Sequence, residues 1–158
     1  MSEQLVKTSY EETIYTVTLA RPEKRNAVSD RLLAALDQAL IATPEGTRVI
    51  ILAGEGKHFC AGLDLSEHQN RDPFGVMQHS RGWHRIFDRI QNGGIPVVAA
   101  MQGAVIGGGL ELATATHVRI SEPSTIYQLP EGRHGIFVGG GASVRVATII
   151  GAGRMCEM

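Results

Sequence analysis

Two glutamates and a glycine-rich stretch are the residues of this sequence whose types and spacing could do chemistry. Residues 103–111 read GAVIGGGLE, so four glycines in seven positions run into the carboxylate of Glu111. A backbone without side chains lets a ligand approach peptide N–H groups closely, and a neighbouring carboxylate could then act on that ligand. A second glutamate, Glu131, follows Pro130 in a predicted turn, where a side chain is easily aimed at a site.

Glycine-rich stretches also invite a phosphate-loop interpretation, which this sequence does not favour. Residues 103–109 do not fit G-x-G-x-x-G. Residues 54–57 (GEGK) lack both the earlier glycine and the following Ser or Thr of a P-loop. A nucleophile elbow, G-x-S-x-G, also fails, because residues 141–145 (GASVR) end in arginine.

Four side chains near residue 60 could be assembled into a metal site. They are His58, Cys60, Asp64 and His68. Their spacing matches no recognised ligand set, so no metal is expected.

A second loop of small residues makes the glycine stretch more informative. Residues 60–62 (CAG) also follow a predicted buried strand, so two bare backbone segments could face one crevice at the carboxyl ends of strands. Glu111 is expected in the first turn of its own helix, near N–H groups that carry the positive end of the dipole. Two N–H donors and two carboxylates suit chemistry through an enolate, because donors stabilise an oxyanion while carboxylates move protons or activate water. A tight turn with a solvent-facing glutamate is the alternative, and the residues alone leave both open.

The composition is typical of a globular protein and disfavours some classes of binding partner. The 158 residues suit one domain, with 43% hydrophobic and 20% charged residues. A net charge of −1 without a Lys/Arg-rich run disfavours nucleic acid and anionic membranes as partners. Every apolar run is shorter than the ~20 residues of a membrane helix. Two distant cysteines, Cys60 and Cys156, and no basic-then-apolar leader predict a reduced, cytoplasmic protein.

The elements that must position the glutamates can be predicted from apolar periodicity and from breakers. Their order is a hairpin, a helix, a strand, a loop, a helix, a strand, a short helix, two short strands and a helix, which favours an α/β fold with parallel pairing and right-handed crossovers. Ser29 is the expected N-cap of the first helix, and the first strand after it is expected to be buried on both faces. The predicted ranges are hairpin 5–20, helix 32–41, strand 49–53, a helix through 83–90 ending at 92–94, strand 95–101, a short helix at 110–113, strands 117–121 and 125–129, and helix 142–150 broken at 151–153.

Three segments resemble the signatures of the crotonase superfamily, the enoyl-CoA hydratase/isomerase group. They are residues 59–65 (FCAGLDL), 103–113 (GAVIGGGLELA) and 129–132 (LPEG). Residues 21–27 (RPEKRNA) are similar to the early turn of that family. The resemblance implies a crotonase-like spiral of ββα units, with residues 1–158 forming a single N-terminal core domain.

The resemblance also assigns roles to positions of this sequence. It implies that the N–H groups of Leu63 and Gly108 form an oxyanion hole for the thioester carbonyl of an acyl-CoA. Glu111 and Glu131 would be catalytic, since hydratases of the family carry both glutamates. Coenzyme A would enter as part of the substrate, with no separate cofactor. The positions implied to contact the CoA part are Ala61, Asp64, Leu65, Lys24 and Arg25.

With both glutamates present, the resemblance implies syn addition of water to a 2-enoyl-CoA. Glu131 would exchange a proton with the α-carbon and Glu111 would orient the water. Two alternatives remain, an isomerase or other enolate chemistry that depends chiefly on Glu131, and an inactive acyl-CoA-binding fragment. Arg133 and His134 are expected near the site, where a positive charge would favour the Glu131 carboxylate.

Family members continue for roughly another hundred residues of helix, about the size of a further small domain. The resemblance therefore implies that the C-terminal helical region is absent from this chain, with residues 155–158 beginning a helix. In the family that region covers the acyl pocket and mediates trimer packing, so a homotrimer or hexamer is expected of the full-length protein.

Overall fold

The computed structural model describes residues 4–67 and 72–158. Its element order follows the prediction, with a short strand at 104–106 and a last helix at 152–157 that were not predicted. The strands are β1 (Val6–Glu11), β2 (Ile14–Leu19), β3 (Val49–Gly54), β4 (Val97–Met101), β5 (Ala104–Ile106), β6 (Val118–Ser121) and β7 (Ile126–Gln128). The α-helices are α1 (Asp30–Ile41), α2 (Pro73–Asn92), α3 (Gly108–Ala115), α4 (Ala142–Ile150) and α5 (Ala152–Glu157). Three short 3-10 helices are η1 (Pro22–Lys24), η2 (Leu65–Glu67) and η3 (Pro130–His134).

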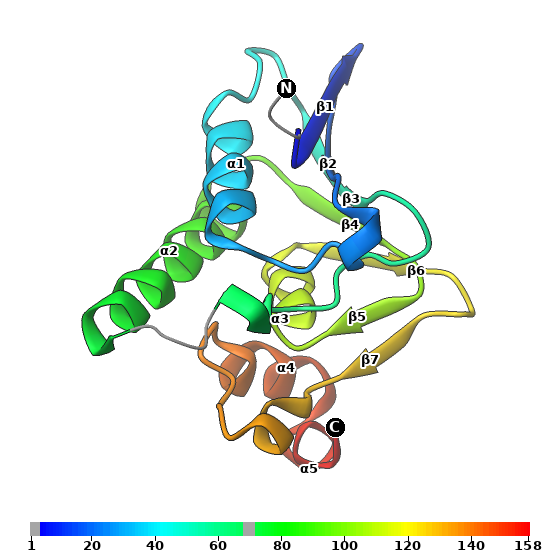
Figure 1. Cartoon of the computed structure of the whole chain (residues 1–158). Coiled ribbons are helices and arrows are strands. Elements are labelled where there is room, and N and C mark those ends of the chain that lie inside the picture. Colours follow the sequence, from blue (N-terminus) through cyan, green and yellow to red (C-terminus); the bar gives the residue numbers. More distant parts are fainter. Residues whose placement is uncertain (1–3, 68–71) are drawn as a thin grey trace.

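A five-stranded sheet in the order β1-β2-β3-β4-β6 forms the centre of the fold. The β1–β2 hairpin is antiparallel, whereas β2–β3, β3–β4 and β4–β6 are parallel pairs. Strands β5 and β7 form a separate parallel pair below it (Figure 1). The predicted α/β fold with parallel pairing is therefore confirmed.

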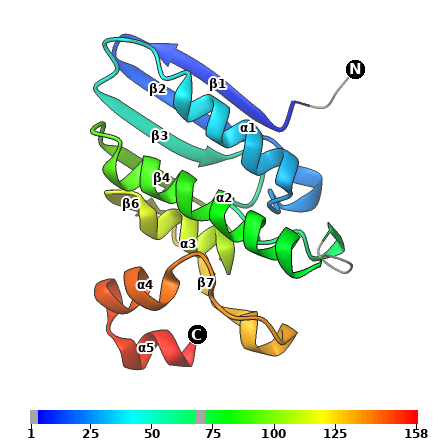
Figure 2. The same ribbon diagram turned by 90° about the vertical axis from the view of Figure 1, so that its left-hand side faces the viewer.

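Helices α1 and α2 run side by side over one face of the sheet (Figure 2). Ser29 caps α1, as predicted, because its hydroxyl oxygen accepts the N–H of Leu32 at 3.1 Å. Helix α2 begins at Pro73, well before the predicted apolar positions, and Asp72 caps it by accepting the N–H of Gly75. Its first two turns escaped prediction because their apolar residues face outward, whereas the buried side chains begin at Trp83.

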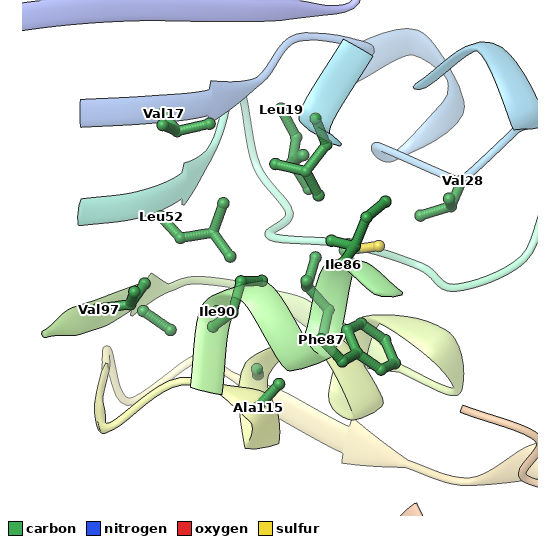
Figure 3. Packing of buried hydrophobic residues seen from close by; sticks show 14 of the residues in the cluster. Val17, Leu19, Val28, Leu52, Ile86, Phe87, Ile90, Val97 and Ala115 are labelled. Carbon is green, nitrogen blue, oxygen red and sulfur yellow. The ribbon is translucent and has the colours of Figure 1, made fainter. Parts of the chain in front are cut away.

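The hydrophobic core lies between these two helices and the sheet. Figure 3 shows Ile86, Phe87 and Ile90 of α2 among side chains of β2, β3 and β4. The prediction that β3 is buried on both faces is wrong in part, because its residues alternate between buried and half-buried. The buried side chains of β3, Ile50 and Leu52, belong to the same hydrophobic core as those of α2.

The chain after the sheet folds back as α4 and α5, beside β7 (Figure 1). Helix α4 agrees with the predicted helix 142–150. The predicted break at 151–153 is shorter than expected, since α5 begins at Ala152 and contains Gly153. A glycine inside a helix costs only about 1 kcal/mol, so Gly151 alone separates the two helices.

Candidate active site

The loop that follows β3 is joined by backbone hydrogen bonds to β5, the short strand that leads from β4 into the glycine stretch. The N–H of Cys60 donates to the carbonyl of Ala104, and the N–H of Ile106 donates to the carbonyl of Cys60. Cys60 of this loop and Val105 of β5 form a parallel bridge. The two bare backbone segments therefore face one crevice at the carboxyl ends of β3 and β4, as the sequence predicted.

Gly62 brings the two expected oxyanion donors together. Its φ is +88°, and a Cβ atom placed on it would lie 2.7 Å from the carbonyl oxygen of Ile106 and 3.2 Å from the nitrogen of Gly108. A side chain at this position would separate the loops, so glycine permits the close approach. The nitrogens of Leu63 and Gly108 consequently belong to the same short stretch of surface.

The hydrogen-bond pattern leaves both nitrogens facing the crevice. Val28 donates to the carbonyl of Gly62 and accepts the N–H of Asp64, so the intervening N–H of Leu63 points to the opposite side. Gly108 is the first residue of α3, where a backbone N–H has no partner within the helix. Both residues line the same cavity.

Glu111 is buried, and its carboxylate lies at the N-terminus of a neighbouring helix. Its Oε1 accepts the N–H groups of Gly140 at 2.8 Å and Ala142 at 3.1 Å, and Ala142 is the first residue of α4. Glu111 does lie in the first turn of α3, as predicted. The donors that hold its carboxylate, however, belong to α4 and its approach rather than to α3. Sequence spacing could not show this, because the partners are about 30 residues away in the chain.

The pKa of Glu111 is raised above that of an ordinary glutamate. Burial is the main cause and outweighs the hydrogen bonds from Ala142 and Gly140, which favour the carboxylate. The charge of Glu131 raises this pKa further, whereas Arg145 lowers it. Two carboxylates that repel each other in this way tend to hold one proton between them.

Glu131 lies on η3 and is also buried, but its carboxylate is less well satisfied. Its Oε2 has no hydrogen-bond partner among the described residues. Burial is again the main cause of a raised pKa. The charge of His134 lowers this pKa, in the predicted direction, but burial prevails. The two carboxylates therefore differ in their partners, since Glu111 accepts two backbone N–H groups whereas Oε2 of Glu131 accepts none among the described residues.

A cavity of about 320 Å³ contains all four of the groups that the sequence singled out for chemistry. Leu63 and Gly108 contribute the N–H donors, and Glu111 and Glu131 the carboxylates. Residues that the sequence did not single out complete its wall, namely Val76, His79, Ser80, Trp83, Gly135, Ile136, Phe137, Gly139 and Gly140. The apolar spacing of α2 had marked Trp83 for the core only, and Phe137 belongs to a loop without periodicity.

Asp64 does not line this cavity. Its Oδ1 accepts the hydroxyl of Ser66 at 2.5 Å, and its Oδ2 lies 2.9 Å from Nη1 of Arg21 in an ion pair without hydrogen-bond geometry. The Ser66 hydroxyl is the main cause of a lowered pKa, and Arg21 adds to it. Asp64 therefore fixes the loop that carries Leu63, and a contact of its carboxylate with CoA remains a prediction.

The other residues expected to contact CoA do not line the cavity. Lys24 and Arg25 lie at the end of η1, Ala61 lies in the loop that follows β3, and Leu65 begins η2. The N–H of Ala61 donates to the carbonyl of Arg25 at 3.0 Å, so the loop and the early turn are in contact. The side chains of Lys24, Arg25 and Leu65 are exposed. The structure thus joins the early turn to the loop at Ala61, and the role of these residues in binding CoA stays a prediction.

The suggested metal ligands do not form a recognisable site. Burial raises the pKa of the Cys60 thiol to about 12, and its Sγ donates to the carbonyl of Asn26. His58 accepts the N–H of Ala104 through Nδ1, while His68 lies outside the described residues. Within residues 4–67 and 72–158, no three His, Cys, Asp or Glu side chains are placed to hold a metal ion.

None of the helices in the described part of the chain has the length and apolar character needed to cross a membrane.

Known proteins resemble this chain in both sequence and structure. A family model described as "Enoyl-CoA hydratase/isomerase" matches residues 9–158. A probable enoyl-CoA hydratase of Mycobacterium tuberculosis is 35% identical over 150 residues, covering 93% of this chain and 59% of that protein. An enoyl-CoA isomerase/hydratase of Mycosarcoma maydis is 36% identical over 156 residues, covering 92% of this chain and 57% of that protein.

A solved structure with high similarity is the putative enoyl-CoA hydratase from Rhodopseudomonas palustris. It is 49% identical with a TM-score of 0.94, and the match covers 100% of this chain and 62% of that one. The similarity confirms the crotonase-like fold predicted from the sequence. The chain spans about three-fifths of the length of the relatives that it matches.

Proposed function

Since the chain belongs to the enoyl-CoA hydratase/isomerase family, we propose that its cavity binds a 2-enoyl-CoA thioester and adds water across the double bond. The proposal rests on one observation. Two buried carboxyl groups with raised pKa line the same cavity as two backbone N–H groups that point into it. Coenzyme A enters as part of the substrate, and the exposed junction of η1 with the loop at Ala61 is the proposed place for its polar end.

The two N–H groups stabilise the charge that develops on the thioester oxygen. When water adds to the β-carbon of a 2-enoyl thioester, electron density moves through the double bond to the carbonyl, which acquires enolate character. Donors from Leu63 and Gly108 are fixed before the reaction begins, so they stabilise this charge without reorganising. Removing one donor of this kind typically costs about 3–4 kcal/mol in the transition state.

The two carboxylates divide the proton transfers. Glu111 enters ionised, accepts a proton from water and directs the oxygen to the β-carbon. Glu131 enters protonated and gives its proton to the α-carbon. The sum is the addition of one water molecule, and the proton on Glu111 must return to Glu131 before the next cycle. This division follows from the N–H groups that hold Glu111 and from the unpartnered Oε2 of Glu131.

The test compares Glu111→Gln and Glu131→Gln with the wild-type chain in the hydration of a short 2-enoyl-CoA. Each variant is expected to lose at least about a hundredfold in kcat, the usual range for general acid–base groups. Glu45→Gln, at an exposed glutamate, is the matched control and should behave as wild type. Near-normal turnover by Glu131→Gln would refute the assignment.

Double-bond migration of a 3-enoyl-CoA, measured on the same samples, separates hydration from isomerisation. An isomerase would keep migration in Glu111→Gln and lose it in Glu131→Gln. Titration with a CoA thioester tests the third possibility. A chain that binds the thioester but catalyses neither hydration nor double-bond migration would be an inactive acyl-CoA-binding fragment.

A further inference from the structure

Trp83 presses against the backbone that carries the Gly108 N–H. A Cβ atom placed on Gly108 would lie 2.8 Å from Cη2 of the Trp83 indole and 3.3 Å from its Cζ2. The indole therefore occupies the space that a side chain at position 108 would need. It is also a wall of the cavity and only 6% exposed, so its position determines where Gly108 lies.

Hydrogen bonds to a histidine and an aspartate fix the orientation of this indole. The Trp83 N–H donates to Nε2 of His79 at 2.7 Å, and Nδ1 of His79 lies 2.6 Å from Oδ1 of Asp30. Because Nε2 accepts a hydrogen bond, the proton of the neutral imidazole is on Nδ1 and is donated to Asp30. The chain Asp30–His79–Trp83 thus links the first residue of α1 to the cavity wall.

The same face of α2 also reaches the residues that hold Glu111. His79, Trp83 and Phe87 are spaced by four residues, and the rings of Trp83 and Phe87 meet edge to face with centroids 5.2 Å apart. A Cβ atom on Gly140 would lie 2.8 Å from Cε2 of Phe87. One ridge of α2 therefore packs against Gly108 through Trp83 and against Gly140 through Phe87.

We propose that Trp83, held by His79 and Asp30, is a positioning residue that fixes the Gly108 N–H for the developing oxyanion. Its effect on turnover rests on the proposed function, whereas its effect on Gly108 does not. Loss of the hydrogen bond lets the indole tilt and Gly108 move with it. A displacement of about 1 Å at a reacting centre can cost on the order of a hundredfold in rate.

The experiment compares four variants. His79→Leu removes the acceptor for the indole N–H, His79→Gln retains an acceptor, and Trp83→Phe removes the donor and shortens the ring. His84→Leu is the matched control, because His84 is an exposed histidine on the same helix and lies outside the cavity. Three readouts are taken, namely kcat and KM for hydration, the emission of the single tryptophan, and amide exchange of Gly108 by NMR in the ligand-free protein.

His79→Leu should lower kcat about tenfold or more with little change in KM, because the donor acts chiefly in the transition state. Its tryptophan emission should shift to longer wavelength, and Gly108 exchange should rise about tenfold. His79→Gln should recover most of each effect, Trp83→Phe should resemble His79→Leu in kcat and exchange, and His84→Leu should match wild type.

The proposal is overturned when His79→Leu and Trp83→Phe match His84→Leu in both Gly108 exchange and kcat. When the wild-type chain hydrates no 2-enoyl-CoA, the proposed function fails, and Gly108 exchange with tryptophan emission still decides the positioning role. If His79→Leu does not fold, His79→Gln and Trp83→Phe carry the same comparison.

Discussion

The fold gives the two glutamates of the site, Glu111 and Glu131, different surroundings. Glu111 accepts two backbone N–H groups at the N-terminus of α4, whereas Oε2 of Glu131 has no partner among the described residues. Burial raises the pKa of both carboxyls. A buried carboxylate oxygen without a partner destabilises the folded state, and such a cost at a cavity is typical of functional residues.

Glu131→Gln is expected to stabilise the chain at neutral pH and not at acidic pH. Because the folded-state pKa of Glu131 is raised above 4.5, ionisation penalises the folded state. Below the pKa that Glu131 has in the unfolded chain, the carboxyl is protonated in both the folded and the unfolded state, and the penalty is absent. It grows as the pH rises through the folded pKa, and above that it is constant.

Thermal unfolding of wild type and Glu131→Gln at several pH values measures this difference. A Tm gain of about 2–4 °C above the folded pKa is expected, the shift that ~1 kcal/mol produces in a domain of this size. Glu45→Gln serves as the exposed control. A Tm gain independent of pH would show that ionisation of Glu131 does not destabilise the fold.

At the scale of elements, the site is a junction between two loops and three helices. The loop after β3 and the first residue of α3 supply the N–H groups, while α3, η3 and the start of α4 supply and hold the carboxylates. The loops can meet only where a side chain is missing, which makes Gly62 the position where backbone packing and chemistry depend on each other.

Gly62→Ala is expected to destabilise the fold more than Gly94→Ala does. Both glycines have positive φ, +88° and +81°, so alanine is strained at either position. Only Gly62 has neighbours within reach of a Cβ atom, with the carbonyl of Ile106 at 2.7 Å, whereas nothing lies within 4 Å at Gly94.

Urea unfolding of the two variants separates strain from steric overlap. Each should lose about 1 kcal/mol from strain, and Gly62→Ala should lose a further 1–3 kcal/mol, roughly the cost of overpacking. Equal losses would mean that the two loops are free to move apart at Gly62.

At the scale of the whole molecule, an apolar region lies on the side away from α1 and α2. A second cavity of about 250 Å³ is lined by residues of β6, β7, α3 and α4, among them Arg119, Tyr127 and Ile149. Next in the sequence to two of its lining residues, Ile120 is 61% exposed and Ile126 is 58% exposed. An apolar cavity together with exposed isoleucines favours association.

Copies of the chain are therefore expected to associate through this region, while the homotrimer or hexamer expected from the sequence concerns the full-length protein and stays a prediction. Sedimentation velocity should find species larger than 17.0 kDa at micromolar concentration. The double variant Ile120→Lys/Ile126→Lys should shift the distribution to the monomer, whereas lysine at the exposed Val76 of the active-site cavity should not. A wild-type chain that is monomeric at every concentration would refute this prediction.

The sequence by itself determined the local structure and the chemical parts. Apolar periodicity and helix-breaking residues located the strands and helices. This works because side chains recur on one face every 3.6 residues in a helix and every second residue in a strand. Glu111, Glu131, Leu63 and Gly108 were singled out from motifs, and the fold places all four around one cavity.

Only the tertiary structure decided what holds those parts. The N–H donors of Glu111 come from residues 140 and 142, and the indole behind Gly108 comes from α2. Such contacts join segments about 25–30 residues apart, and they depend on how helices pack, which no local pattern specifies. Burial, which raises the pKa of both glutamates, is likewise a property of the packed molecule and not of any segment.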